Sequence, residues 1–220
     1  MPRLAFSTVL GFMFATGGFA ADTAKIEQGD TDWKLSTTQA GLTIYSRAHP
    51  GNNSLKEFKA VGEFDSPSRA VHGVIADYEA YPTFMPYTVE CRLLKKETDA
   101  YVTYNRVSPK ICSDRDYVLR VWSTSTPGAG GTVYTNKWAA TNEAAPAPKP
   151  NVMRIKTCEG SWLLEPDGPD KTRATYVCYT DTGGMVPAFL ANHFAQSGIV
   201  KVFAAIRKQA RNPKYNVAER

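Results

Sequence analysis

The sequence predicts an α+β protein in which one long C-terminal helix covers a mostly antiparallel sheet. Two observations indicate this fold class. Short strand-like segments separated by turn signals fill most of residues 41–182, and the longest helical pattern of the chain follows at 183–211. A single terminal helix over a sheet suggests a cup that is closed by a lid.

The first twenty residues have the pattern of a secretory signal peptide. Arg3 supplies a positive charge, residues 4–14 are mostly apolar, and the small residues Gly18 and Ala20 offer a cleavage site after Ala20. The apolar run is too short to favour a membrane span. We therefore expect an exported protein, periplasmic or secreted, with residues 21–220 as a single domain.

The composition argues against several classes of function. A formal net charge of +5 is mildly basic, which suits either an anionic membrane surface or an ordinary solvated surface. We find no dense basic patch or nucleic-acid motif, and therefore expect no nucleic-acid partner. The sequence also lacks a P-loop, a dinucleotide fingerprint and a cysteine–histidine cluster with metal spacing, so no cofactor or metal is expected.

The elements are justified in chain order. Residues 55–64 alternate between apolar and charged side chains, which is typical of an antiparallel strand with one buried and one solvent-exposed face. A helix is expected to follow, with Ser66 as its N-cap and Pro67 at its first position. Turn signals delimit the remaining segments. The expected strands are 41–48, 55–64, 88–97, 100–107, 114–126, 132–142, 152–165 and 171–182.

Four cysteines in an exported chain allow disulfides. Cys158 and Cys178 lie on either side of the turn at 165–170, and a hairpin about this turn would place them nearly opposite each other. A cross-strand bridge between them is therefore a candidate.

The C-terminal helix carries two apolar sets. The first is Val186, Phe189, Leu190 and Phe194, and the second begins at Ile199, nearly opposite on a straight helix. The helix is thus expected either to bend near residues 197–198 or to be covered on both sides. His193 faces with the first set, where a packing role is favoured over a catalytic base because no partner is nearby in sequence. We assign no catalytic residue.

Charge is concentrated in residues 113–117, where Arg115 lies between Asp114 and Asp116. Two carboxylates beside one guanidinium suggest a structural ion-pair network. A paired-carboxylate hydrolase is disfavoured, because adjacent residues of a strand point to opposite faces.

Two motifs resemble a known family. SDRDYV at 113–118 and GGMVPAFLAN at 183–192 are similar to segments of the START (steroidogenic acute regulatory protein-related lipid transfer) domain, and the resemblance covers about Trp33 to Arg211. It implies a helix-grip fold, in which a curved antiparallel sheet wraps around the long C-terminal helix and leaves an internal lipid tunnel. It also implies a monomeric, non-enzymatic carrier of one lipid that contacts membranes transiently.

The resemblance also indicates positions of the tunnel wall. In cholesterol-binding relatives a glutamate and an arginine line the tunnel, and the matching positions here are Asn105 and Val121, so the charged pair is missing. Asn105 and the Tyr117 hydroxyl are either anchors for a ligand or partners of neighbouring side chains. The residues expected to line the tunnel are Phe84, Tyr101, Thr103, Asn105, Tyr117, Leu119, Val121, Val186, Phe189, Leu190, His193 and Phe194.

The loop at 107–112 matches the gate loop of the family, with Lys110 and Ile111 at its tip. Lys110 is expected to contact lipid phosphate and Ile111 the membrane interface. The lipid itself stays open among sterols, phospholipids and other long-chain lipids. Two alternatives remain: an enzyme of the polyketide cyclase or hydrolase type with His193 as its base, and an interaction module whose own side chains fill the cavity.

Overall fold

The computed structural model describes residues 32–109, 112–141, 143–184 and 186–216. The expected signal peptide and the gate-loop residues Lys110 and Ile111 lie outside the described residues. Residues from Trp33 onward form the unit that contains the sheet and all described helices.

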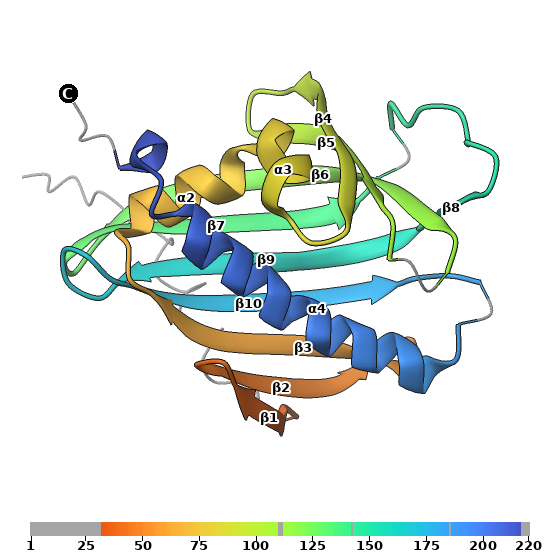
Figure 1. Ribbon diagram of the computed structural model, residues 1–220, viewed down its shortest axis with the longest axis horizontal. Coiled ribbons are helices and arrows are strands. Elements are labelled where there is room, and N and C mark those ends of the chain that lie inside the picture. The colour runs from red at the N-terminus through yellow and green to blue at the C-terminus, as the bar shows by residue number, and fades with distance from the viewer. Residues whose placement is uncertain (1–31, 110–111, 142, 185, 217–220) are drawn as a thin grey trace, which may run out of the picture. The chain divides into compact units, whose positions relative to one another are not determined.

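The described residues form a ten-stranded sheet that curves around one helix (Figure 1). Its order is β1-β2-β3-β10-β9-β7-β6-β5-β4, in which all neighbours are antiparallel, and the short β8 pairs parallel with β6. The strands are β1 (Lys34–Gln39), β2 (Leu42–His49), β3 (Asn52–Phe64), β4 (Thr88–Lys96), β5 (Ala100–Val107), β6 (Asp114–Gly128), β7 (Gly131–Ala140), β8 (Val152–Arg154), β9 (Thr157–Pro166) and β10 (Thr172–Asp181).

Most expected strands are present, with two differences. Strand β1 was not predicted, because its side chains are mostly exposed and polar and show no alternation. The expected strand 152–165 is divided into β8 and β9, because the chain leaves the main ladder at Ile155, whose N–H donates to the Asp116 carbonyl at 2.8 Å.

The helices are α2 (Ser68–Ala76), the 3-10 helix η1 (Tyr78–Ala80), α3 (Tyr81–Phe84), α4 (Ala188–Gln209) and the 3-10 helix η2 (Pro213–Tyr215). The expected cap at Ser66 is wrong, because Pro67 holds the N-cap position of α2 and no side chain caps the helix. The Ser66 carbonyl instead accepts a hydrogen bond from the Thr172 hydroxyl at 2.7 Å, which ties this connection to β10.

Helix α4 crosses the inner face of the sheet in front of β9, β10 and β3 (Figure 1). It is one continuous helix through residues 197–198, where a bend was one of the two expectations. Its second half belongs to the core, where the Phe203 ring lies 5.3 Å from Phe64 and 5.1 Å from Trp162 between centroids. The buried Ile199 and Ile206 complete this anchor. Phe189 and Phe194 in the first half are exposed, so the helix is not covered on both sides.

Candidate functional site

A hollow lies under the first half of α4 and extends along the sheet. Its first part, which we call the helix compartment, has a volume of about 300 Å³. Its second part, the sheet compartment, has a volume of about 230 Å³. Six residues line both parts, so the two compartments are neighbours: Val107, Tyr117, Cys158, Tyr176, Thr180 and Val202.

Small side chains on one face of α4 leave room for the helix compartment. Ala191, Ala195, Gly198, Ile199 and Val202 line it at spacings of three and four residues. A Cβ placed on Gly198 would have no atom within 4 Å, so this position opens directly onto free space. Ala191, Ala195 and Gly198 were not predicted as lining, because such small residues do not stand out as an apolar set. Ile199 and Val202 belong to the second apolar set, which was not assigned to the lining. Their helical spacing is the signal that could have identified them.

Most of the expected lining residues of the sheet lie on the wall of the sheet compartment. Thr103, Asn105, Tyr117, Leu119 and Val121 all line the sheet compartment. The register explains this result, because Thr103 pairs with Leu119 and Asn105 pairs with Tyr117 in adjacent strands. Cross-strand partners point to the same face of a sheet, so these side chains share one wall of the compartment.

Two expected lining residues lie elsewhere. Tyr101 lines a separate surface pocket, because Tyr78 of η1 packs against it at 6.0 Å between ring centroids and occupies the space between it and the sheet compartment. Phe84, at the end of α3, lines neither compartment. Its ring packs on Tyr81 at 5.7 Å and against the core.

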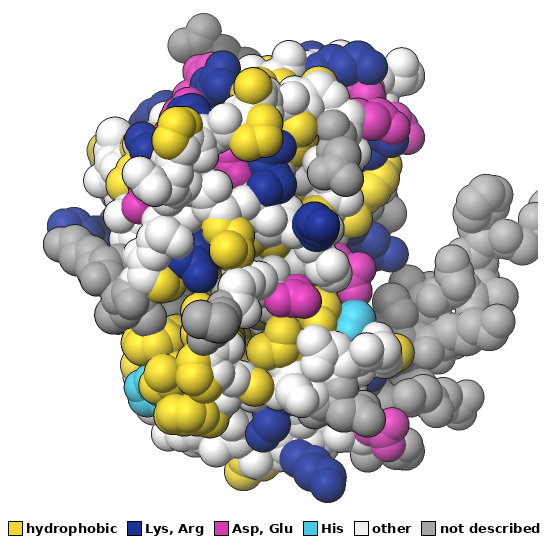
Figure 2. Space-filling view, turned by 90° about the vertical axis from the view of Figure 1, so that its right-hand side faces the viewer, with side chains coloured by type: hydrophobic (Ala, Val, Ile, Leu, Met, Phe, Trp, Pro, Cys, Tyr) yellow, Lys and Arg dark blue, Asp and Glu magenta, His cyan; other side chains and the backbone are white. Residues whose placement is uncertain are grey.

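The start of α4 is rotated differently from the expectation. Val186 and Phe194 line the helix compartment, whereas Phe189, Leu190 and His193 do not. Phe189 is 71% exposed, because it lies about 200° around the helix from the cavity-facing Ala191. Figure 2 views the molecule from the side where α4 begins and shows hydrophobic side chains gathered on this face. The first apolar set therefore forms an exposed surface more than a cavity wall.

Some polar groups of the sheet compartment are already hydrogen-bonded to neighbouring side chains, whereas others have no partner in the described part of the chain and could bond to a ligand. The Asn105 side chain accepts from the Cys91 thiol and donates to the Thr103 hydroxyl, both at 3.1 Å, so it satisfies neighbouring side chains. The Tyr117 hydroxyl has no hydrogen-bond partner among the described residues, and burial raises its pKa. The buried Asn136 Oδ1, which the sequence reasoning missed, also lacks a partner there. Tyr117 and Asn136 can therefore bond to a ligand.

Arg115 does not join the expected network with its neighbours in sequence. It is only 4% exposed and lines the helix compartment. Its Nη1 donates to the carbonyl and the hydroxyl of Ser113, while its buried Nε has no partner among the described residues. Because side chains alternate along β6, Arg115 points away from Asp114 and Asp116.

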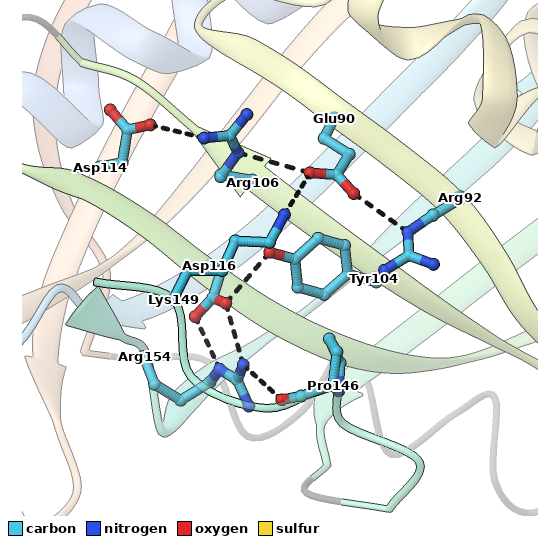
Figure 3. Close-up of polar contacts among 9 residues, drawn as sticks. All are labelled: Glu90, Arg92, Tyr104, Arg106, Asp114, Asp116, Pro146, Lys149 and Arg154. Carbon is cyan, nitrogen blue, oxygen red and sulfur yellow. Dashed lines mark hydrogen bonds and ion pairs between the residues drawn. The ribbon is translucent and has the colours of Figure 1, made fainter. Parts of the chain in front are cut away.

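Asp114 and Asp116 are two residues apart in β6 and therefore share one face, so the expectation that opposite faces separate this carboxylate pair is wrong. Each aspartate instead belongs to an ion-pair network with other partners (Figure 3). Asp116 is 1% exposed and receives two hydrogen bonds from Arg154, Nε to Oδ1 at 2.6 Å and Nη2 to Oδ2 at 2.9 Å. Burial alone would raise the pKa of the Asp116 carboxyl, but the hydrogen bonds and charge of Arg154 lower it below its ordinary value. Tyr104 donates to Asp116 Oδ2 at 3.1 Å.

The same network holds the loop before β8 against the sheet. Arg154 Nη2 donates to the Pro146 carbonyl at 3.1 Å, and Lys149 Nζ lies 2.8 Å from Glu90 Oε2 (Figure 3). Arg106 bridges Glu90 and Asp114 at 3.4 and 3.3 Å. These contacts lie away from the two compartments, so the network is structural.

The candidate disulfide between Cys158 and Cys178 is wrong, because both thiols are free. Cys158 pairs with Thr180 and Cys178 pairs with Gly160, so the two cysteines are diagonal neighbours. Diagonal residues lie about 7–8 Å apart, which exceeds the usual span of a disulfide. Burial raises the pKa of Cys178 to about 12.

Groups that could support catalysis are scarce around the hollow. No histidine, aspartate or glutamate occurs among the described residues that line either compartment. His193 is on the exposed side of α4, where its ring contacts Phe194 at 5.7 Å. Within the described ranges, no group of three or more histidine, cysteine or acidic residues could hold a metal ion. None of the described helices is long and apolar enough to cross a membrane.

A curved antiparallel sheet that grips a C-terminal helix and encloses an apolar hollow defines the helix-grip class of protein. The expected fold class is thus confirmed. A family model described as the START domain matches residues 20–215, and the chain belongs to this family. The resemblance of the 113–118 and 183–192 motifs is therefore confirmed as well.

Comparison with individual proteins gives the same result. The chain is 27% identical to the mouse phosphatidylcholine transfer protein over 184 residues, which cover 82% of this chain and 85% of that protein. It is 26% identical to the crystal structure of a STAR-related lipid transfer protein fragment from Xanthomonas axonopodis, with a TM-score of 0.71 and coverage of 82% and 99%. The Zhui aromatase/cyclase of Streptomyces sp. R1128 shares the fold alone, at 15% identity and a TM-score of 0.51, with coverage of 72% and 94%.

Proposed function

We propose that this protein binds one lipid molecule in the two adjoining compartments and transfers it between membranes. The observation that carries the proposal is an apolar hollow under α4 whose floor is formed by alternate residues of β5 and β6. Binding sites for apolar molecules are concave and mostly hydrophobic with a few polar anchors, which describes this hollow. Membership of the START family and similarity to two proteins named for lipid transfer support the same function.

Release and uptake require the hollow to open. The first half of α4 is the mobile element of the proposal, since its second half is anchored by Ile199, Phe203 and Ile206. Phe189 and Phe194 are exposed at this end. Phe194 lines the helix compartment together with Pro109 and Cys112, which flank Lys110 and Ile111. The two phenylalanine side chains suit insertion into a membrane interface during exchange. An exported monomer that meets membranes transiently fits this mode of action.

The test is uptake of lipid by the purified protein. Native mass spectrometry after gentle purification should show one lipid per chain, or one after incubation with phospholipid vesicles. Bound lipid should also raise the melting temperature, because it binds only the folded state. A protein that carries no lipid and extracts none from vesicles, at unchanged melting temperature, would contradict the proposal.

An enzyme of the polyketide cyclase or hydrolase type is the alternative on the same scaffold. It would need an acid or base inside the hollow, and His193 was the expected base. Because His193 lies on the exposed side of α4 and outside the lining, we favour a carrier that is not an enzyme. His193→Ala separates the two functions: a carrier keeps its lipid uptake, whereas loss of a catalytic turnover in this variant would support the enzyme.

A further inference from the structure

We propose that Arg115 binds the anionic group of the lipid, either a phosphodiester or a carboxylate, inside the helix compartment. The inference rests on the proposed function and narrows its ligand to a lipid with an acidic group. Its starting point is a guanidinium that is buried, lines the hollow and lacks an ion-pair partner among the described residues.

The burial of Arg115 calls for a counterion. Removing a charged group from water is costly unless the group is paired and hydrogen-bonded. Arg115 donates hydrogen bonds to Ser113 through Nη1 alone. The two acceptors, the carbonyl oxygen and the hydroxyl of Ser113, are both uncharged. The two aspartates that flank Arg115 in sequence are bonded to Arg106 and Arg154 on the other face of β6. The described residues around the hollow therefore leave the positive charge of Arg115 without a counter-charge.

The free edge of the guanidinium fits a two-oxygen anion. Nε is buried without a partner, and no hydrogen bond to Nη2 occurs among the described residues. These two nitrogens form one side of the planar fork, which matches carboxylate and phosphate oxygens through two parallel hydrogen bonds. Gly184 lies beside Nη2, where a Cβ would make an ordinary contact with Nη2 at 3.8 Å and a tight one with Met153 Sδ at 3.2 Å.

The charge distribution of the hollow gives the ligand an orientation. Arg115 and the exposed Lys56 are the charged residues among the described lining of the helix compartment, and no acidic residue occurs there. The described lining of the sheet compartment contains no charged residue. An anionic group would thus lie at Arg115, and the hydrocarbon would extend along Leu119 and Val121 into the sheet compartment.

The experiment compares lipids that share oleoyl chains and differ in their polar group. Wild-type protein is incubated with mixed vesicles that contain oleic acid, dioleoylphosphatidylglycerol and dioleoylglycerol, then re-isolated, and its bound lipids are quantified by mass spectrometry. We expect oleate or phosphatidylglycerol to exceed dioleoylglycerol about tenfold or more after correction for vesicle content. An excess of oleate would identify a carboxylate site, and an excess of phosphatidylglycerol would identify a phosphodiester site.

Variants of Arg115 test the assignment. Arg115→Gln should lower the ratio of bound acidic to bound neutral lipid at least tenfold. Arg115→Lys should lower this ratio less, because lysine keeps the positive charge. Arg211→Gln is the matched control, because it makes the same charge change at an exposed position remote from the lining residues. The ratio is measured within each variant, so a lower yield of folded protein does not alter it.

The outcomes separate this inference from the proposed function. Equal binding of dioleoylglycerol by the wild type, or an unchanged ratio in Arg115→Gln, would overturn the role of Arg115 while leaving lipid binding intact. Binding of none of the three lipids would instead contradict the carrier function itself.

Discussion

The side chain of Asn192 on α4 is bonded to the backbone of β3 at Lys56. Its Oδ1 accepts the Lys56 N–H at 3.0 Å, and its Nδ2 donates to the Ser54 carbonyl at 3.1 Å. These two hydrogen bonds fasten the first half of α4 beside the helix compartment, which Asn192 and Lys56 both line. The second half is held by burial in the core. Asn192 therefore acts as a latch on the part of the helix that must open.

Removal of this latch should accelerate lipid exchange. In Asn192→Ala, both bonds are lost, so we expect stability to fall by about 1–2 kcal/mol and lipid release to become several-fold faster. Hydrogen exchange should rise at residues 188–198 and stay unchanged at 203–209. The control is Gln196→Ala, which loses one exposed hydrogen bond to Ser36 and should alter neither quantity much. Slower release in Asn192→Ala would contradict the latch.

Gly198 offers a test of the free space under α4. Gly198→Ala should stabilise the protein by about 1 kcal/mol, because alanine favours the helix and a Cβ meets no atom within 4 Å. Gly198→Phe should place its ring in the helix compartment and abolish lipid uptake without unfolding the protein. Thermal unfolding and vesicle extraction measure the two effects.

Ala204→Phe is the matched control, since it adds a ring to an exposed position of α4. We expect this variant to keep full uptake. Undiminished uptake by Gly198→Phe would mean that the helix compartment is not occupied by ligand.

The strands and the inward residues of β5 and β6 could be predicted because alternation is a local property. The family resemblance supplied Asn105 and Val121, and alternation from these two positions added Thr103 and Leu119, which line the sheet compartment, but also Tyr101, which does not. Family motifs identified the grip of the sheet on the C-terminal helix. Strand β1 was missed because an exposed edge strand carries no such alternation.

The helix face and the charge partners could not be predicted from local pattern. Phe189 looks like a cavity residue by hydrophobicity, yet packing of the second half of α4 fixes its rotation and exposes this ring. The separation of Arg115 from Asp116 follows from strand alternation, which the expected network between these neighbours overlooked. The partner of Asp116 is Arg154, which the parallel pairing of β8 with β6 brings into contact.

Loss of Arg154 should destabilise the fold without changing the preference for ligand. Arg154→Met leaves the buried Asp116 carboxylate without its partner, which costs about 3–5 kcal/mol. The loss of unfolding free energy relative to the wild type should be largest at neutral pH. It should become smaller on acidification, because the Asp116 carboxyl becomes protonated. Denaturant unfolding measures it.

A double variant provides the control for Arg154→Met. Arg154→Met with Asp116→Asn should recover part of the lost stability, because the uncompensated charge is gone. The ratio of acidic to neutral lipid should equal that of the wild type in both variants, since the network lies away from the hollow. A shifted ratio would show that the network contributes to ligand choice.

His72 should make stability depend on pH in the weakly acidic range. Burial lowers its pKa below 6.5, and the ring stacks on Tyr134 at 4.3 Å while Nε2 lies 3.0 Å from the Ser123 hydroxyl. The unfolded chain then binds a proton more readily than the folded protein does. The contribution of neutral His72 is therefore complete above about pH 6.5 and is lost as the pH falls below that value toward the folded pKa.

Substitution of His72 should flatten this dependence. The variant His72→Gln keeps a polar group near Ser123 but does not titrate, so its free energy of unfolding should fall less than that of the wild type between pH 7.5 and pH 5 (urea unfolding across this range). His193→Gln is the matched control, because it removes an exposed imidazole and should preserve the wild-type slope. Since Ser123 also accepts a hydrogen bond from Asn136 at 3.2 Å, protonation of His72 would disturb the wall of the sheet compartment. Parallel wild-type and His72→Gln curves would exclude His72 as the source of the pH dependence.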